Sequence, residues 1–157
     1  MSNPAVLEGQ LAAHDLRVAI VAARFNEFIV KSLVRGAERA WAKHGGRAER
    51  LTVIRVPGAF ELPAAARHLA ASGRYAAIVA LGCVIRGDTA HFDYVAGESA
   101  RGLMQAALDS LVPVAFGVLT VETVEQAIER AALGAGDKGG EAMETALEMA
   151  NLFAATR

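Results

Sequence analysis

The sequence lacks the features that mark several classes of protein. Cys83 is its single cysteine, so no disulfide can form within the chain. Charged residues interrupt every apolar stretch, and none reaches the roughly 18 residues that a membrane span needs. Lysine and arginine number 16 against 17 aspartates and glutamates, which provides neither a basic surface for nucleic acid nor an acidic tail. The first ten residues, MSNPAVLEGQ, have no basic and apolar signal-peptide regions. We therefore expect a cytoplasmic protein with no nucleic-acid or membrane partner.

Aromatic residues are also scarce, at 6%, although 54% of the 157 residues are hydrophobic. Alanine accounts for 34 of them, so much of the surplus is small side chain. With a membrane span excluded, two explanations remain: surface buried against copies of the same chain, or an alanine-rich composition without further meaning. If self-association is correct, much of the alanine-rich surface of the helices predicted at 28–44 and 90–111 is buried between subunits.

Four short apolar runs alternate with helical patterns along the chain. The runs lack a clean polar alternation, which is typical of strands buried on both faces of a parallel sheet. The predicted strands are residues 17–23, 51–56, 76–85 and 112–119, and the predicted helices are 28–44, 60–72, 90–111, 124–132 and 139–155. Thr123 and Gln126 form a capping box, and the glycine-rich run 134–140 is expected to be a loop between two helices. The order predicts one α/β domain over 1–157, with helices on both faces of a mainly parallel four-stranded sheet.

Ligands of such sheets bind beyond the carboxyl ends of the strands. The segment 84–91 (VIRGDTAH) runs from the third strand into a helix, with Gly87 for a turn and Thr89 as a possible cap. Free N–H groups at this helix start would suit a phosphate. Such a site also requires a cation, and Asp88 could contribute only through its backbone N–H, with its carboxylate turned away. An ordinary capped helix start is the alternative.

Two further positions have both a functional and a structural interpretation. His91 could transfer protons near neutral pH beside this crevice, or it could be a surface or packing histidine. At the second strand end, Phe60 could cover a flat ring while Glu61 reads its polar edge, or both could simply open a helix. Cys83 lies inside a predicted strand, which favours packing over nucleophilic chemistry.

Motifs for metals and common cofactors are missing. One cysteine and four scattered histidines give no ligand spacing for a metal. The chain has no dinucleotide-binding glycine motif, no P-loop and no nucleophile elbow. We therefore expect no metal and no organic cofactor.

In combination, the motifs resemble the lumazine synthase family. They match in order and spacing from about residue 8 to residue 153, and they are RFN at 24–26, VPGAFELP at 56–63, GCVIRGDTAHFDYV at 82–95, FGVLT at 116–120, EQAIERA at 125–131 and DKG at 137–139. The resemblance implies a flavodoxin-like three-layer α/β/α sandwich. It also implies a transferase of riboflavin biosynthesis that condenses 5-amino-6-(D-ribitylamino)uracil with 3,4-dihydroxy-2-butanone 4-phosphate. The products are 6,7-dimethyl-8-ribityllumazine, phosphate and water, and no cofactor is involved.

The resemblance also implies roles for particular residues. His91 would transfer protons, and Phe25 would stack on the pyrimidine ring with Asn26 beside it. The phosphate would bind Asp88 and Thr89, with Arg130 supplying the charge. The remaining substrate-binding positions would be Ala59, Phe60, Glu61, Cys83, Val84, Ile85, Phe116 and Lys138. In this family the residue at Phe116 usually comes from a neighbouring subunit.

The implied partners are the two small-molecule substrates, further copies of the chain in a pentamer or a shell of pentamers, and riboflavin synthase. The N-terminal segment 1–14 is expected to pack on a neighbouring subunit. One departure affects the shell: many family members read Gly-x-Lys-x-Gly-Asn-Lys-Gly where this chain has ALGAGDKG at 132–139. Other hypotheses remain: a non-catalytic flavin- or lumazine-binding protein of the same fold, an unrelated flavodoxin-like phosphate-binding domain, and a shell protein whose assembly is its function.

Overall fold

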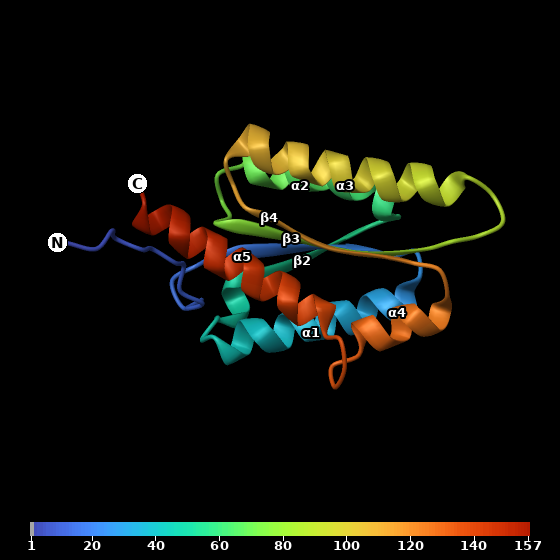
Figure 1. Cartoon of the computed structure of the whole chain (residues 1–157), viewed down its shortest axis with the longest axis horizontal. Helices are drawn as coiled ribbons and strands as arrows, with labels where there is room; N and C mark the ends of the chain where they lie inside the picture. Colours follow the sequence, from blue (N-terminus) through green and yellow to red (C-terminus); the bar gives the residue numbers. More distant parts are fainter. Residues whose placement is uncertain (1) are drawn as a thin grey trace.

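The computed structural model describes residues 2–157 as a four-stranded sheet between two layers of helices (Figure 1). All strand pairs are parallel, and the strand order is β2-β1-β3-β4. The strands are β1 (Val18–Ala23), β2 (Leu51–Val56), β3 (Ala77–Ile85) and β4 (Val114–Val121). The predicted three-layer, flavodoxin-like α/β sandwich is confirmed, with a sheet that is wholly rather than mainly parallel.

The helices cover the two faces unequally. The longer helices are α1 (Glu27–Lys43), α2 (Leu62–Ala71), α3 (His91–Ser110), α4 (Val124–Ala131) and α5 (Lys138–Ala155), and two short 3-10 turns are η1 (Ala48–Arg50) and η2 (Ala59–Glu61). Helices α2 and α3 lie on one face, and α1, α4 and α5 lie on the other (Figure 1). All five predicted helices are therefore present, each within two residues of its expected ends once η2 is counted with α2.

The central strand β1 explains why the apolar runs lack a polar alternation. Its residues Val18, Ile20 and Ala22 pack under α1, α4 and α5, while Ala19 and Val21 pack under α2 and α3. Successive side chains of a strand point to opposite faces, so both sets must be apolar when both faces are covered. Every residue of β1 is buried as a result.

The structure corrects two boundaries. Strand β4 begins at Val114 and ends at Val121, two residues later than predicted, because Leu111 ends α3 in the left-handed conformation (φ 59°) before Pro113. Helix α5 begins at Lys138, one residue before its predicted start, so the predicted loop over 134–140 ends before residue 138. Asp137 caps this helix by accepting a hydrogen bond from the Gly140 N–H at 3.1 Å.

The chain order places a reversal between β1 and β3. From β1 the chain moves outward to β2, then crosses back to β3 on the far side of β1 and continues to β4. The carboxyl ends of all four strands lie on the side away from both chain termini (Figure 1). The crevice at such a reversal is where open α/β sheets bind ligands.

The N-terminal segment before β1 has no helix or strand in residues 2–12. It runs along α5, where the Asn151 side chain donates to the carbonyls of Gln10 (2.7 Å) and Ala12 (3.0 Å). Val6 and Leu7 are exposed. Packing of the segment 1–14 on a neighbouring subunit stays a prediction, and Met1 lies outside the described residues. No helix in the described chain is long and apolar enough to cross a membrane.

Candidate functional site

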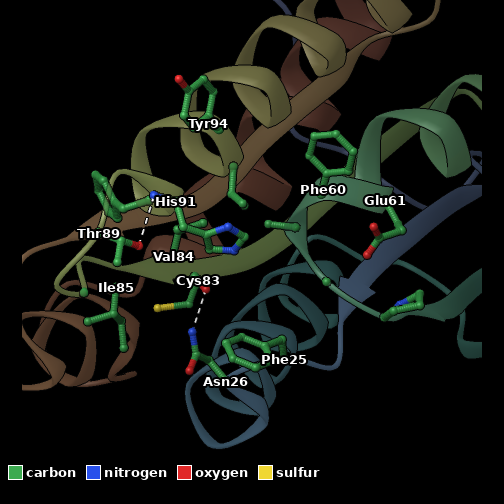
Figure 2. A pocket seen from close by; sticks show the side chains of 16 residues that line it. Phe25, Asn26, Phe60, Glu61, Cys83, Val84, Ile85, Thr89, His91 and Tyr94 are labelled. Carbon is green, nitrogen blue, oxygen red and sulfur yellow. Dashed lines mark hydrogen bonds between the residues drawn. The ribbon is translucent and has the colours of Figure 1, made fainter.

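A cavity of about 830 Å³ opens at the carboxyl ends of β1, β2 and β3, beside the start of α3. We call it the first pocket. Figure 2 shows its side chains converging from these elements. Its lining consists of Phe25, Asn26, Pro57, Gly58, Ala59, Phe60, Glu61, Cys83, Val84, Ile85, Gly87, Thr89, His91, Phe92, Tyr94 and Val95. Ten of the predicted site residues are therefore brought together in one place.

The end of β1 presents Phe25 to this pocket. Phe25 is 72% exposed, and its backbone N–H donates to the Pro57 carbonyl at 3.0 Å. The next residue, Asn26, adopts the left-handed conformation (φ 60°), and its side-chain amide donates to the Cys83 carbonyl at 2.8 Å (Figure 2). Asn26 thus ties the start of α1 to the end of β3 and holds Phe25 at the pocket edge.

The turn after β2 forms the opposite wall. Ala59 is buried, whereas Phe60 is 58% exposed and the Glu61 carboxylate extends toward the cavity (Figure 2). Gly58 lies between Glu61 and Phe25. A β-carbon added at Gly58 would lie 3.3 Å from Glu61 Oε1 and 3.9 Å from the Phe25 β-carbon. An exposed ring on each side and a carboxylate between them suit a flat ligand with hydrogen-bonding edges.

The end of β3 provides the floor through Cys83, Val84 and Ile85. Cys83 is buried, and this burial raises the pKa of its thiol to about 11. The thiol is therefore protonated at neutral pH and is a poor nucleophile. This agrees with the prediction that Cys83 packs rather than reacts.

The loop between β3 and α3 has little internal bonding. Thr89 Oγ1 accepts a long hydrogen bond of 3.4 Å from the His91 N–H, and Ala90, not Thr89, occupies the N-cap position. Within residues 2–157, no group accepts a hydrogen bond from the N–H groups of Gly87, Asp88 or Thr89. These donors are thus available to an anion at the start of α3.

His91 begins α3, and its imidazole extends into the middle of the first pocket, between Phe60 and Val84 (Figure 2). Asp88 does not line the pocket, although its neighbours Gly87 and Thr89 do. This is consistent with an Asp88 that offers its backbone N–H and keeps its carboxylate away.

Three predicted residues lie elsewhere in the subunit. Phe116, Arg130 and Lys138 line a second pocket of about 790 Å³ between β4 and α5. Phe116 pairs in register with Ala80, three residues before Cys83, which places it about 10 Å back along the strands from the nearest β3 residue of the first pocket. Arg130 donates to the Gln126 carbonyl at 3.1 Å, and Lys138 pairs with Glu141 at 2.8 Å.

Sequence reasoning missed several lining residues. Tyr94 and Val95 follow His91 by three and four positions, so helical periodicity would have placed them on the same face of α3. Gly58 and Gly87 belong to quoted motifs without having been assigned to the site. No group of three or more His, Cys, Asp or Glu side chains in residues 2–157 is arranged to hold a metal ion.

A parallel sheet covered on both faces, with an aromatic and partly polar crevice at its reversal, defines a small-molecule-binding protein of the flavodoxin-like α/β class. Comparison with known proteins is more specific. The family model described as 6,7-dimethyl-8-ribityllumazine synthase matches residues 15–154. The chain therefore belongs to the 6,7-dimethyl-8-ribityllumazine synthase family, as the motifs predicted.

Individual relatives agree with the family model. Proteins named 6,7-dimethyl-8-ribityllumazine synthase from Chlorobium limicola, Deinococcus radiodurans and Pelodictyon phaeoclathratiforme are 53%, 54% and 54% identical to this chain. Each match spans 147 residues, which is 94% of this chain and 95% of the relative.

Proposed function

We propose that this chain is a transferase that makes 6,7-dimethyl-8-ribityllumazine from 5-amino-6-(D-ribitylamino)uracil and 3,4-dihydroxy-2-butanone 4-phosphate. The observation that carries the proposal is that Phe25, His91 and the unpaired N–H groups of the loop at 87–89 meet at one crevice, in a chain of this family. The reaction releases one water as the imine forms, then inorganic phosphate, then a second water as the ring closes. It makes or breaks no bond that requires a metal or an organic cofactor.

The pyrimidine ring binds between Phe25 and the turn after β2. Phe25 provides an exposed face for stacking. Ala59, Phe60 and Glu61 hold the ring edge and the ribityl chain, together with the backbone of residues 83–85 at the end of β3. Asn26 lies beside this site, where its amide already bonds to the Cys83 carbonyl.

The phosphate binds at the start of α3. The N–H groups of Asp88 and Thr89 point to this role because they have no acceptor among residues 2–157. A phosphate monoester carries a charge of roughly −1.5 to −2 at pH 7, so the site also needs a cation. Arg130 supplies it, with Lys138 close by, and both lie at the second pocket rather than the first.

His91 moves protons during imine formation, phosphate elimination and ring closure. Its imidazole lies between the ring site and the phosphate site, where these steps take place (Figure 2). Holding the two substrates together contributes much of the acceleration, because effective molarities of positioned reactants are very high. A general acid–base group then adds a factor of about 10²–10⁴.

The complete site needs two subunits. The first pocket has the ring wall, His91 and the N–H donors, and the second pocket has Phe116, Arg130 and Lys138. Phe116 is half exposed on the edge strand β4, where a neighbour can reach it. We infer that the second pocket of one copy closes the first pocket of the next in a ring of five.

Other exposed surfaces support self-association. Met104, Leu108 and Leu111 are each at least 60% exposed on or just after α3. The alanine-rich surface of α1 contributes less than predicted, because Ala37 and Ala40 are already buried inside the subunit. The unpaired edge of β2 and the exposed N-terminal segment offer a further contact between copies. Three further predictions concern a larger shell, riboflavin synthase as a partner and a cytoplasmic location. Light scattering distinguishes a pentamer from a shell.

The direct test is to mix the purified protein with both substrates and follow lumazine absorbance, fluorescence and phosphate release. The wild type produces lumazine and phosphate in equal amounts. Arg130→Ala raises the KM for the butanone phosphate about 10- to 100-fold, as expected for loss of a charged hydrogen bond, while Arg74→Ala at the opposite end of the sheet does not. No lumazine from the wild type would contradict the proposed function.

A further inference from the structure

Arg86 is a charged residue at the pocket edge to which the proposed chemistry gives no role. It directly follows β3 and precedes the loop at 87–90, and its N–H donates to the Val121 carbonyl at 2.9 Å. It does not line the first pocket, although both of its chain neighbours do. Its side chain is 42% exposed.

The Arg86 guanidinium makes three contacts with two other segments. Its Nε donates to Glu122 Oε2 at 2.8 Å, at the turn between β4 and α4. Its Nη1 lies 3.5 Å from Asp93 Oδ1, in the first turn of α3. Its Cζ lies 4.3 Å from the centre of the Phe92 ring, which itself lines the first pocket. A planar guanidinium can bond in its plane and stack on a ring at the same time, which a lysine cannot.

The residues that Arg86 contacts lie on either side of the loop at 87–90 in the fold. This loop carries the N–H groups proposed for phosphate, and its one side-chain hydrogen bond among the described residues is the long bond from the His91 N–H to Thr89. Its two ends are Arg86 and the first turn of α3. A side chain that fixes Phe92 and Asp93 relative to the end of β3 therefore fixes the span of this loop.

We infer that Arg86 is a positioning residue for the phosphate-binding loop. It holds the first turn of α3 against the β4–α4 turn and thereby aligns the N–H groups of residues 87–89. It does not touch the substrate. The inference rests on the proposed function, since it concerns the binding of the phosphorylated substrate.

The competing possibility is that Arg86 binds the phosphate directly. The two roles predict opposite results when a carboxylate partner is removed. If Arg86 positions the loop, Glu122→Gln loosens it and weakens phosphate binding. If Arg86 is itself a phosphate ligand, Glu122→Gln frees the guanidinium and strengthens binding.

The experiment measures the KM of each substrate and the competitive inhibition constant of inorganic phosphate for four variants of the assembled enzyme. Arg86→Gln is expected to raise both the KM for the butanone phosphate and the phosphate inhibition constant about tenfold, from one cation–π contact and two partly exposed ion pairs. Glu122→Gln and Asp93→Asn each raise both constants about two- to fivefold. The KM for the ribitylaminouracil stays within about twofold, because the ring site is untouched.

Arg74→Gln is the matched control. Arg74 also stacks on a ring, with its Cζ 5.5 Å from the centre of Tyr75, but it lies at the opposite end of β3. Its loss leaves all three constants unchanged. Unchanged phosphate constants in Arg86→Gln, or tighter phosphate binding in Glu122→Gln, would overturn the inference. If Arg86→Gln does not fold, Glu122→Gln and Asp93→Asn decide it. Absence of lumazine from the wild type refutes the proposed function instead, so the two failures are distinguishable.

Discussion

Asn26 provides the sharpest test of how the ring site is held, because two features meet in one residue. Its backbone is left-handed at φ 60°, and its side chain donates to the Cys83 carbonyl at 2.8 Å. Replacement by glycine removes the hydrogen bond but keeps the left-handed conformation accessible. Replacement by alanine removes the bond and also makes that conformation unfavourable.

The expected losses of stability follow from these two contributions. An intramolecular hydrogen bond contributes about 1 kcal/mol, so Asn26→Gly is expected to lower the free energy of unfolding by that amount. A left-handed backbone costs an L-residue about 1–2 kcal/mol more, so Asn26→Ala loses about 2–3 kcal/mol. For a chain of this size, 1 kcal/mol corresponds to about 2–4 °C in Tm.

The assay is thermal unfolding at one fixed protein concentration, since self-association makes Tm depend on concentration. The KM for the ribitylaminouracil is measured alongside, and we expect both variants to raise it because Phe25 loses its fixed neighbour. An alanine variant as stable as the glycine variant would refute the backbone argument. A glycine variant that loses substrate affinity at unchanged Tm would make Asn26 a ligand instead of a positioning residue.

Three further predictions concern chemistry, reactivity and packing. His91→Ala lowers kcat about 10²-fold, within the range of general acid–base catalysis, and steady-state kinetics with an unchanged rate would remove His91 from the mechanism. Cys83 reacts with Ellman's reagent about 100-fold more slowly in the folded protein than in urea, because burial raises the pKa of its thiol from 9.0 to about 11. Between these two pH values the unfolded chain has lost the thiol proton and the folded chain has kept it. The free energy of unfolding therefore falls as the pH rises from 9.0 toward 11. Gly139→Ala forces a β-carbon into the Leu33 carbonyl and costs about 1–3 kcal/mol in urea unfolding. Gly134→Ala, which meets open space, is the control, and an equal loss in both would contradict the packing argument.

The fold was predictable because burial on two faces leaves a simple pattern in the sequence. The run over β1 is apolar at every position, which a strand with one solvent-exposed face would not be.

The predicted capping box at α4 is only half right. Thr123 does accept from the Gln126 N–H at 3.1 Å, but the Gln126 side chain accepts from the Glu122 N–H rather than from Thr123.

The glycines at the start of α5 were predicted both as the end of a loop (134–140) and as the start of a helix (139–155), because glycine on its own favours a loop. Here Gly139 is needed for close packing, since its α-carbon faces the Leu33 carbonyl of α1. That contact joins segments about a hundred residues apart, and no local pattern records it. Tertiary packing overrides the low helix propensity of glycine at this point.

The first pocket was largely predictable, and the second was not. Strand ends can be recognised in the sequence, and the carboxyl ends of parallel strands meet at one edge of the sheet. Phe25, Phe60 and His91 therefore lie together. Phe116 lies within the edge strand β4, and only its register with Ala80 shows how far it lies from the carboxyl ends of the strands. Arg86 was overlooked because its partner Glu122 comes from another turn, 36 positions along the chain.

Two subunits share each active site in the proposed assembly, and mixing two impaired variants can show whether they do. His91→Ala damages the first pocket, and Arg130→Ala damages the second. If both are unfolded together and refolded as mixed rings in equal amounts, about a quarter of the interfaces combine two intact halves. With shared sites, we expect the mixture to form lumazine at about a quarter of the wild-type rate, measured with the butanone phosphate well below its KM in Arg130→Ala. Activity no higher than the mean of the two separate variants would mean that each subunit builds its site alone.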